Sequence, residues 1–105
     1  MQLNIIVDDY SMDLKIPDSF LTASGEAFDR LDRNMDQGVQ IGREWFDNPT
    51  THQRSQVAAD KLLAALETDN ENLALLSAGY IVSRTPGVKR VRIDNSGELQ
   101  CTVFE

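Results

Sequence analysis

The residues with the clearest potential for chemistry are three aspartates in the first half of the chain. Asp29, Asp32 and Asp36 are spaced three and four residues apart, so their carboxylates would share one face of an unbroken helix. Three such oxygen donors could hold a divalent cation. The other interpretation is a solvated face, on which Asp29 pairs with Arg33 one turn later. We favour the solvated face, because the carboxylates of a metal site usually converge from more than one element.

The same segment has part of the pattern of a calcium-binding loop. Asp32, Asn34 and Asp36 match loop positions one, three and five. Gln37 stands where the loop needs glycine, and Arg43 stands where a bidentate glutamate belongs. The cation at that last position argues against a working calcium loop.

Basic residues gather near the end of an otherwise acidic chain. Four of them fall within nine residues: Arg84, Lys89, Arg90 and Arg92. Arg90 and Arg92 alternate with apolar residues, which predicts that they point to the outer face of a sheet. They are either a charged face that discourages edge pairing or a docking strip for an acidic protein surface, including that of a second copy. Duplex nucleic acid is not expected, because the whole chain carries a net charge of −7.

Aromatic and nucleophilic residues offer few further sites. Trp45 and Phe46 are adjacent, so they cannot both face one helical stripe, and at least one must lie at a rim or interface. We expect Trp45 to be mostly buried and keep it as a candidate binding residue. The single histidine and the single cysteine, His52 and Cys101, are the only possible Cys–His pair. We expect Cys101 to point inward from a strand, so the sequence favours a non-catalytic protein without a cofactor.

Two hairpins are predicted at the ends of the chain. In the first, a loop at Asp9 and Tyr10 would place six alternating apolar residues on one face, with Val7 opposite Met12. The full set is Leu3, Ile5, Val7, Met12, Leu14 and Ile16. In the second, residues 95–97 form the loop, so that Ile93 faces Leu99 and Val91 faces Cys101.

Three helical segments are predicted between the hairpins. The first runs from about residue 18 to Phe46, and its glycines allow a break near residue 25 or residue 38. The second opens at Thr50 with a capping box completed by Gln53. The third, residues 73–82, is apolar almost all round and is therefore expected at the centre of the fold.

These elements predict a single α+β domain over residues 1–105, in the order β-β-α-α-α-β-β. The expected architecture is a four-stranded antiparallel sheet made of the two hairpins, with the helices packed on one face. The chain has 105 residues, of which 41% are hydrophobic, and no apolar run approaches the length of a membrane span. The start lacks the features of a secretory signal, so we expect a cytoplasmic protein.

For function, the sequence favours a small acidic protein-interaction or accessory module. The bare sheet face suits a protein partner or a second copy of the same chain, so a homodimer is one expected form. No membrane partner is expected. Two alternatives are a divalent-cation-binding domain at the three aspartates and a small-molecule-binding domain with a pocket lined by Tyr80 or Trp45.

Overall fold

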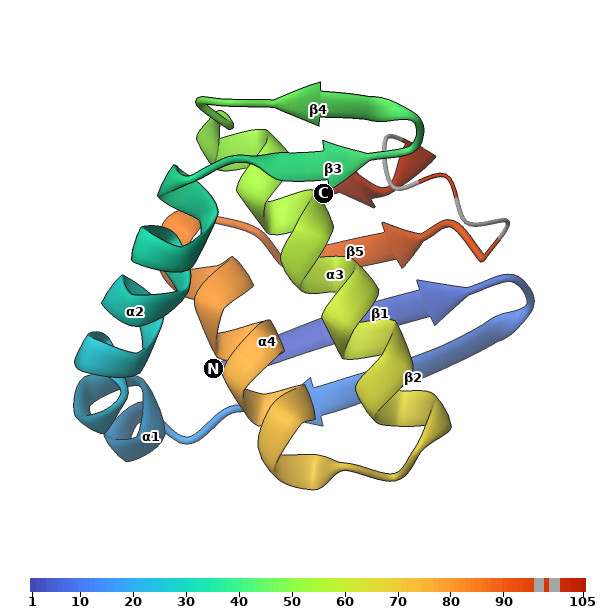
Figure 1. The fold of residues 1–105 in the computed structure, drawn as a ribbon. Helices are drawn as coiled ribbons and strands as arrows, with labels where there is room; N and C mark the ends of the chain where they lie inside the picture. The colour runs from blue at the N-terminus through green and yellow to red at the C-terminus, as the bar shows by residue number, and fades with distance from the viewer. Residues whose placement is uncertain (96–97, 99–100) are drawn as a thin grey trace.

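The computed structural model describes residues 1–95, 98 and 101–105 and has a mixed α+β fold (Figure 1). Its elements are β1 (Gln2–Val7), β2 (Tyr10–Lys15), α1 (Asp18–Ala23), α2 (Gly25–Asp36), β3 (Val39–Ile41), β4 (Glu44–Phe46), α3 (Thr51–Glu67), α4 (Glu71–Arg84), β5 (Arg90–Ile93) and β6 (Val103–Phe104). The main sheet has the strand order β2-β1-β5-β6, and β3 and β4 form a separate two-stranded sheet. The α+β class and the four-stranded main sheet are as predicted.

The main sheet is mixed, so the prediction of a fully antiparallel sheet is wrong. β1 is antiparallel to β2 but parallel to β5, and β5 is antiparallel to β6. A short turn makes the two strands of a hairpin antiparallel. The long helical connection between β2 and β5 places no such restriction on β1 and β5, which come from different hairpins and lie parallel. β1 and β5 take the central positions, and their inward side chains Leu3, Ile5 and Val91 are fully buried.

The first hairpin forms with a different register from the predicted one. Its two-residue loop is Asp8 and Asp9, and Asp8 adopts a positive φ of 53°. Ile5 therefore pairs with Met12 and Val7 with Tyr10. The shift moves every partner by two residues, so the apolar side chains still share one face, as predicted.

The predicted long helix ends well before Phe46. It breaks between α1 and α2 at Ser24, close to the predicted break at residue 25, and ends after Asp36. The next residues form the β3–β4 hairpin, which the sequence analysis missed. Gly38 permits this change of direction with a φ of 115°, and an added Cβ there would lie 2.4 Å from Cζ2 of Trp45.

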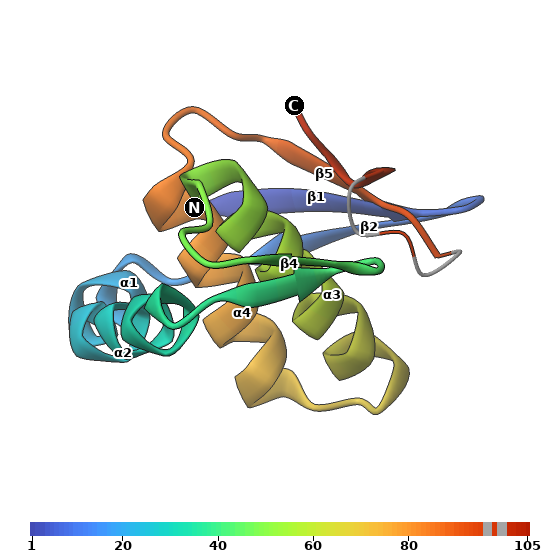
Figure 2. The ribbon, with the colours of Figure 1, turned by 45° about the horizontal axis from the view of Figure 1, so that its top comes forward.

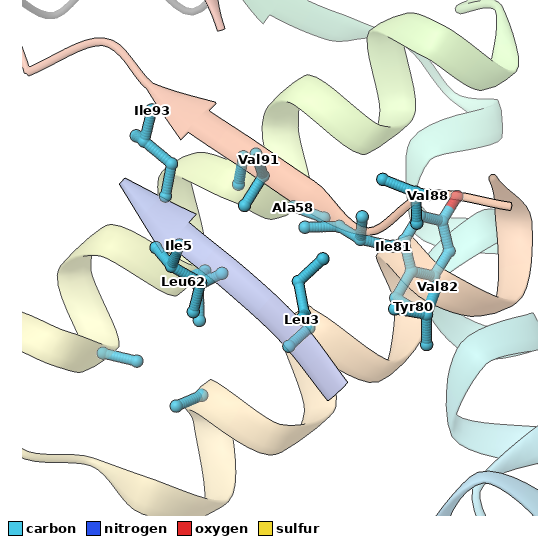
Figure 3. Close-up of a cluster of buried hydrophobic side chains, with 14 of the residues drawn as sticks. Leu3, Ile5, Ala58, Leu62, Tyr80, Ile81, Val82, Val88, Val91 and Ile93 are labelled. Carbon is cyan, nitrogen blue, oxygen red and sulfur yellow. The ribbon is translucent and has the colours of Figure 1, made fainter. Parts of the chain in front are cut away.

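Helices α3 and α4 pack on one face of the main sheet, as predicted (Figure 2). Thr50 and Gln53 form the expected capping box at the start of α3. The core between the two layers joins strand residues Leu3 and Val91 to helix residues Leu62 and Ile81 (Figure 3). Helix α4 buries most of its second half, from Ser77 to Val82.

The second hairpin is antiparallel, as expected, but its register also differs. Val91 pairs with Phe104 rather than with Cys101. Cys101 is exposed and precedes β6, so the expectation of an inward-facing thiol is wrong. Leu99 and loop residues 96 and 97 lie outside the described residues.

We predict that Leu62→Ala lowers the free energy of unfolding by about 2–5 kcal/mol, because Leu62 is fully buried between α3 and the sheet. Leu76→Ala on α4 should cost clearly less, because Leu76 is only partly buried. Chemical denaturation of both variants measures the difference. Equal losses would contradict this packing of the two helices.

Candidate functional site

The three aspartates of α2 face arginines from two other helices. Asp32 Oδ2 accepts a hydrogen bond from Arg84 Nε at 2.9 Å, and Asp32 Oδ1 lies 3.4 Å from Arg54 Nη1. Asp36 pairs with Arg54 at 2.6 Å, and Asp29 pairs with Arg84 at 3.0 Å. This row of three aspartates is therefore not the simple solvated face with an Asp29–Arg33 pair that the sequence suggested. It connects α2 to both α3 and α4.

Tyr80 completes this network from the buried side of α4. Its hydroxyl donates a hydrogen bond of 2.5 Å to Asp32 Oδ1, and the guanidinium of Arg84 lies 5.5 Å from the centre of its ring. Burial raises the pKa of Tyr80, and the hydrogen bond to the Asp32 carboxylate raises it further. Tyr80 is therefore a neutral donor at physiological pH.

The pKa of Asp32 is set by opposing effects. Burial alone raises it, but the hydrogen bonds from Tyr80 and Arg84, together with the charges of Arg84 and Arg54, outweigh burial. The net result is a pKa below the ordinary aspartate value, so Asp32 is ionised at neutral pH.

The aspartates that could have bound a cation are thus held by arginines. Within the described residues, no group of three or more His, Cys, Asp or Glu side chains is arranged to hold a metal ion. A recess of about 490 Å³ adjoins the network and is lined by Asp32, Arg54, Tyr80 and Arg84, among others. Its opposite charges already neutralise one another, so we interpret the network as a structural link between helices.

The structure does not bring the four basic residues together as one strip. Arg84 is engaged by the aspartates of α2, at the end of α4. Arg90 and Arg92 do point to the outer face of β5, as predicted, and Lys89 is exposed beside them. Arg92 pairs with Glu105 at 2.6 Å, which neutralises part of this face.

Trp45 lies on β4 with 60% of its surface exposed, so the expectation that it is mostly buried is wrong. Its ring covers Gly38, and its indole Nε1 donates a hydrogen bond of 2.7 Å to Asp47. The neighbouring Phe46 packs against the core instead. The two aromatics therefore do point to different environments, as their adjacency required.

A larger surface feature lies along β2, which forms one edge of the main sheet (Figure 1). Two adjoining recesses, of about 310 and 640 Å³, follow this strand and share Met12, Leu66 and Asp69. One wall is β2, and the other is formed by the end of α3 and the start of α4. We call this feature the β2 groove.

The floor of the β2 groove is apolar and its rim is acidic. The apolar lining residues are Val7, Met12, Leu14, Leu63, Ala65, Leu66, Ala74 and Leu75. The acidic lining residues are Asp8, Asp9, Glu67, Asp69 and Glu71. None of the described residues that line the groove is a lysine or an arginine.

The sequence alone did not reveal the β2 groove. It placed Met12 and Leu14 correctly on the inner face, but alternation alone does not reveal which strand of a sheet is left at the edge. The polar residues of β2 give no such signal, because the central strand β5 also alternates arginines with its inward residues.

Comparisons with known proteins add no functional information. No protein-family model matches the chain, and neither the curated proteins nor the solved structures searched give a match. Separately, none of the helices in the described ranges is long and apolar enough to cross a membrane.

We predict that Asp32→Asn lowers the free energy of unfolding by about 1–3 kcal/mol at pH 7, because it leaves Arg84 and Tyr80 without their ionised partner. The Asp32 pKa is lower in the folded than in the unfolded state. Its stabilisation is therefore present above about pH 4 and is lost as the pH falls below that value.

Urea denaturation between pH 2.5 and 7 measures this effect, with Asp36→Asn as the control. Asp36 contacts only one of the two arginines and its side chain is 58% exposed, so its replacement should cost less. An Asp32→Asn variant that loses as much stability below pH 4 as the unmodified protein would contradict the assignment.

Proposed function

We propose that this protein is a non-catalytic interaction module that binds an extended segment of a protein partner at β2. The observation that carries the proposal is the open edge of β2 directly beside an apolar groove. In this mode the partner adds a strand to the sheet, its backbone supplies hydrogen bonds, and its alternate side chains enter the groove.

The backbone of β2 has hydrogen-bonding groups available for such a strand. The N–H of Ile16, just after β2, bonds to Met1 at 2.7 Å, so even-numbered residues in this segment direct their N–H and C=O groups toward β1. Ser11, Asp13 and Lys15 consequently direct theirs away from β1. Among the described residues, no strand other than β1 pairs with β2.

The groove provides the apolar contacts that backbone pairing alone lacks. Met12 and Leu14 are partly buried on the same face as Leu66 and Leu75. A partner strand paired with β2 would direct every second side chain to this face, where it would cover these four residues. Covering exposed apolar surface in this way stabilises the complex.

The other exposed surfaces of the sheet are less suitable for a strand. β6 has two residues, so it offers a short edge. On the outer face, the Asn4 side chain donates to Asp13 at 2.9 Å and accepts from Arg90 at 3.0 Å, and Arg92 pairs with Glu105. These polar groups already satisfy one another.

The test is a selection of ten-residue peptides from a random display library on the unmodified protein. We expect the selected peptides to bind Asp13→Ala but to lose about tenfold or more in affinity for Asp13→Pro. Both variants remove the carboxylate, whereas only proline removes the outward N–H, and edge strands tolerate proline at such a position.

Thermal unfolding of both variants checks that the fold is retained. Two results would contradict the proposal: a library that yields no binder, or binders whose affinity is the same for Asp13→Pro and Asp13→Ala.

A further inference from the structure

We infer that the partner segment is basic as well as extended, with lysine or arginine side chains on both sides of an apolar centre. This inference rests on the proposed function, because it names the chemistry of the segment that binds at β2. It is carried by the combination of an apolar floor, an open strand edge and a rim of one charge sign.

The acidic rim surrounds the groove from several elements. Asp8 and Asp9 lie in the β1–β2 loop, Glu67 ends α3, Asp69 lies in the loop after it, and Glu71 begins α4. All of these side chains are exposed. Carboxylates line both recesses, so a strand lying along β2 would pass close to them in each recess.

Most of these carboxylates have no basic partner within the described residues. Asp8 accepts a hydrogen bond from Asn95 at 3.1 Å, and Asn95 is neutral. None of the ion pairs in the described ranges includes Asp9, Glu67, Asp69 or Glu71. The three aspartates of α2 differ in this respect, because each of them pairs with Arg54 or Arg84. The rim therefore presents a negative field to whatever enters the groove.

A second copy of the chain suits this groove less well than a basic segment. Antiparallel pairing of β2 with β2 of another copy would place the helices of both copies on the same side of the joined sheet. The Glu67, Asp69 and Glu71 side chains of the two copies would then approach one another. Each copy also carries a net charge of −7, so the long-range field opposes their encounter.

A basic strand, by contrast, satisfies both parts of the groove. Among the side chains that face the groove, the apolar ones at its centre would cover Met12, Leu14 and Leu66, and the basic ones on both sides would approach the rim carboxylates. Charge complementarity of this kind raises the rate of association and excludes acidic partners. The rim also opposes pairing of this edge with the same edge of another copy, because like charges discourage edge-to-edge contact.

The experiment measures the binding of three labelled ten-residue peptides by fluorescence anisotropy. In all three, four central valines are flanked on each side by three identical residues, which are lysine, threonine or glutamate, so that both residue types occur among the side chains that face the groove. We expect the lysine peptide to bind about tenfold or more tightly than the threonine peptide, and the glutamate peptide to bind weakest. The advantage of the lysine peptide should shrink between about 0.05 M and 0.5 M salt, because screening shortens the range of the field.

A triple variant removes three of the five rim charges without changing side-chain size: Glu67→Gln, Asp69→Asn and Glu71→Gln. Asn suits residue 69, where φ is 54°. We expect this variant to bind the lysine peptide about tenfold more weakly and the threonine peptide unchanged. The control triple variant, Glu26→Gln, Glu44→Gln and Asp60→Asn, makes the same change in net charge at exposed sites away from the groove, and should leave both affinities unchanged.

The outcomes separate this inference from the proposed function. Equal binding of the lysine and threonine peptides, with both lost in Asp13→Pro, would overturn the basic partner and leave strand addition standing. Binding of no peptide, or binding unaffected by Asp13→Pro, would overturn both. A dimer seen by sedimentation that disappears in Asp13→Pro would show that a second copy occupies the edge, and would also overturn the inference.

Discussion

The parallel pairing of β1 with β5 is the constraint on which the rest of the structure depends. It joins the two ends of the chain, and it begins at the hydrogen bond of 2.9 Å from Asn4 N–H to Lys89 O. Once β1 has β5 on one side and β2 on the other, both of its edges are used. Since β6 pairs with β5 and no described strand pairs with the far side of β2, β2 lies at the edge of the sheet, with its outward peptide groups free to pair with another chain.

The helices determine what lies beside that edge. Arg54 and Arg84 bind the aspartates of α2 at the end of the molecule away from the β1–β2 turn, and so fix α2 to α3 and α4. The α3–α4 loop lies near β2 instead, where it leaves Met12 and Leu14 partly uncovered. One acidic cluster is thus neutralised within the fold, while the other stays available at the groove.

The sequence was informative where the signal is local. The alternation of apolar and polar residues placed Leu3 and Ile5 on the inner face of the main sheet, and the Thr50–Gln53 spacing located the start of α3. The sequence was less informative where the structure depends on contacts between residues that lie far apart along the chain. The β3–β4 strands are too short to show a period, and the partners of Asp32 lie 22 and 52 residues away along the chain. The same limit hid the groove, because strand order is a property of the assembled sheet.

Amide hydrogen exchange, read residue by residue, tests the central claim most directly. In the free protein, the amides of Met12 and Leu14 should exchange slowly because they bond to β1, whereas those of Ser11, Asp13 and Lys15 should exchange quickly. Addition of the lysine–valine peptide should slow the exchange of these three amides and leave β6 unchanged. Exchange that stays fast at all three while the peptide is bound, or protection that appears at β6 instead, would contradict strand addition at β2.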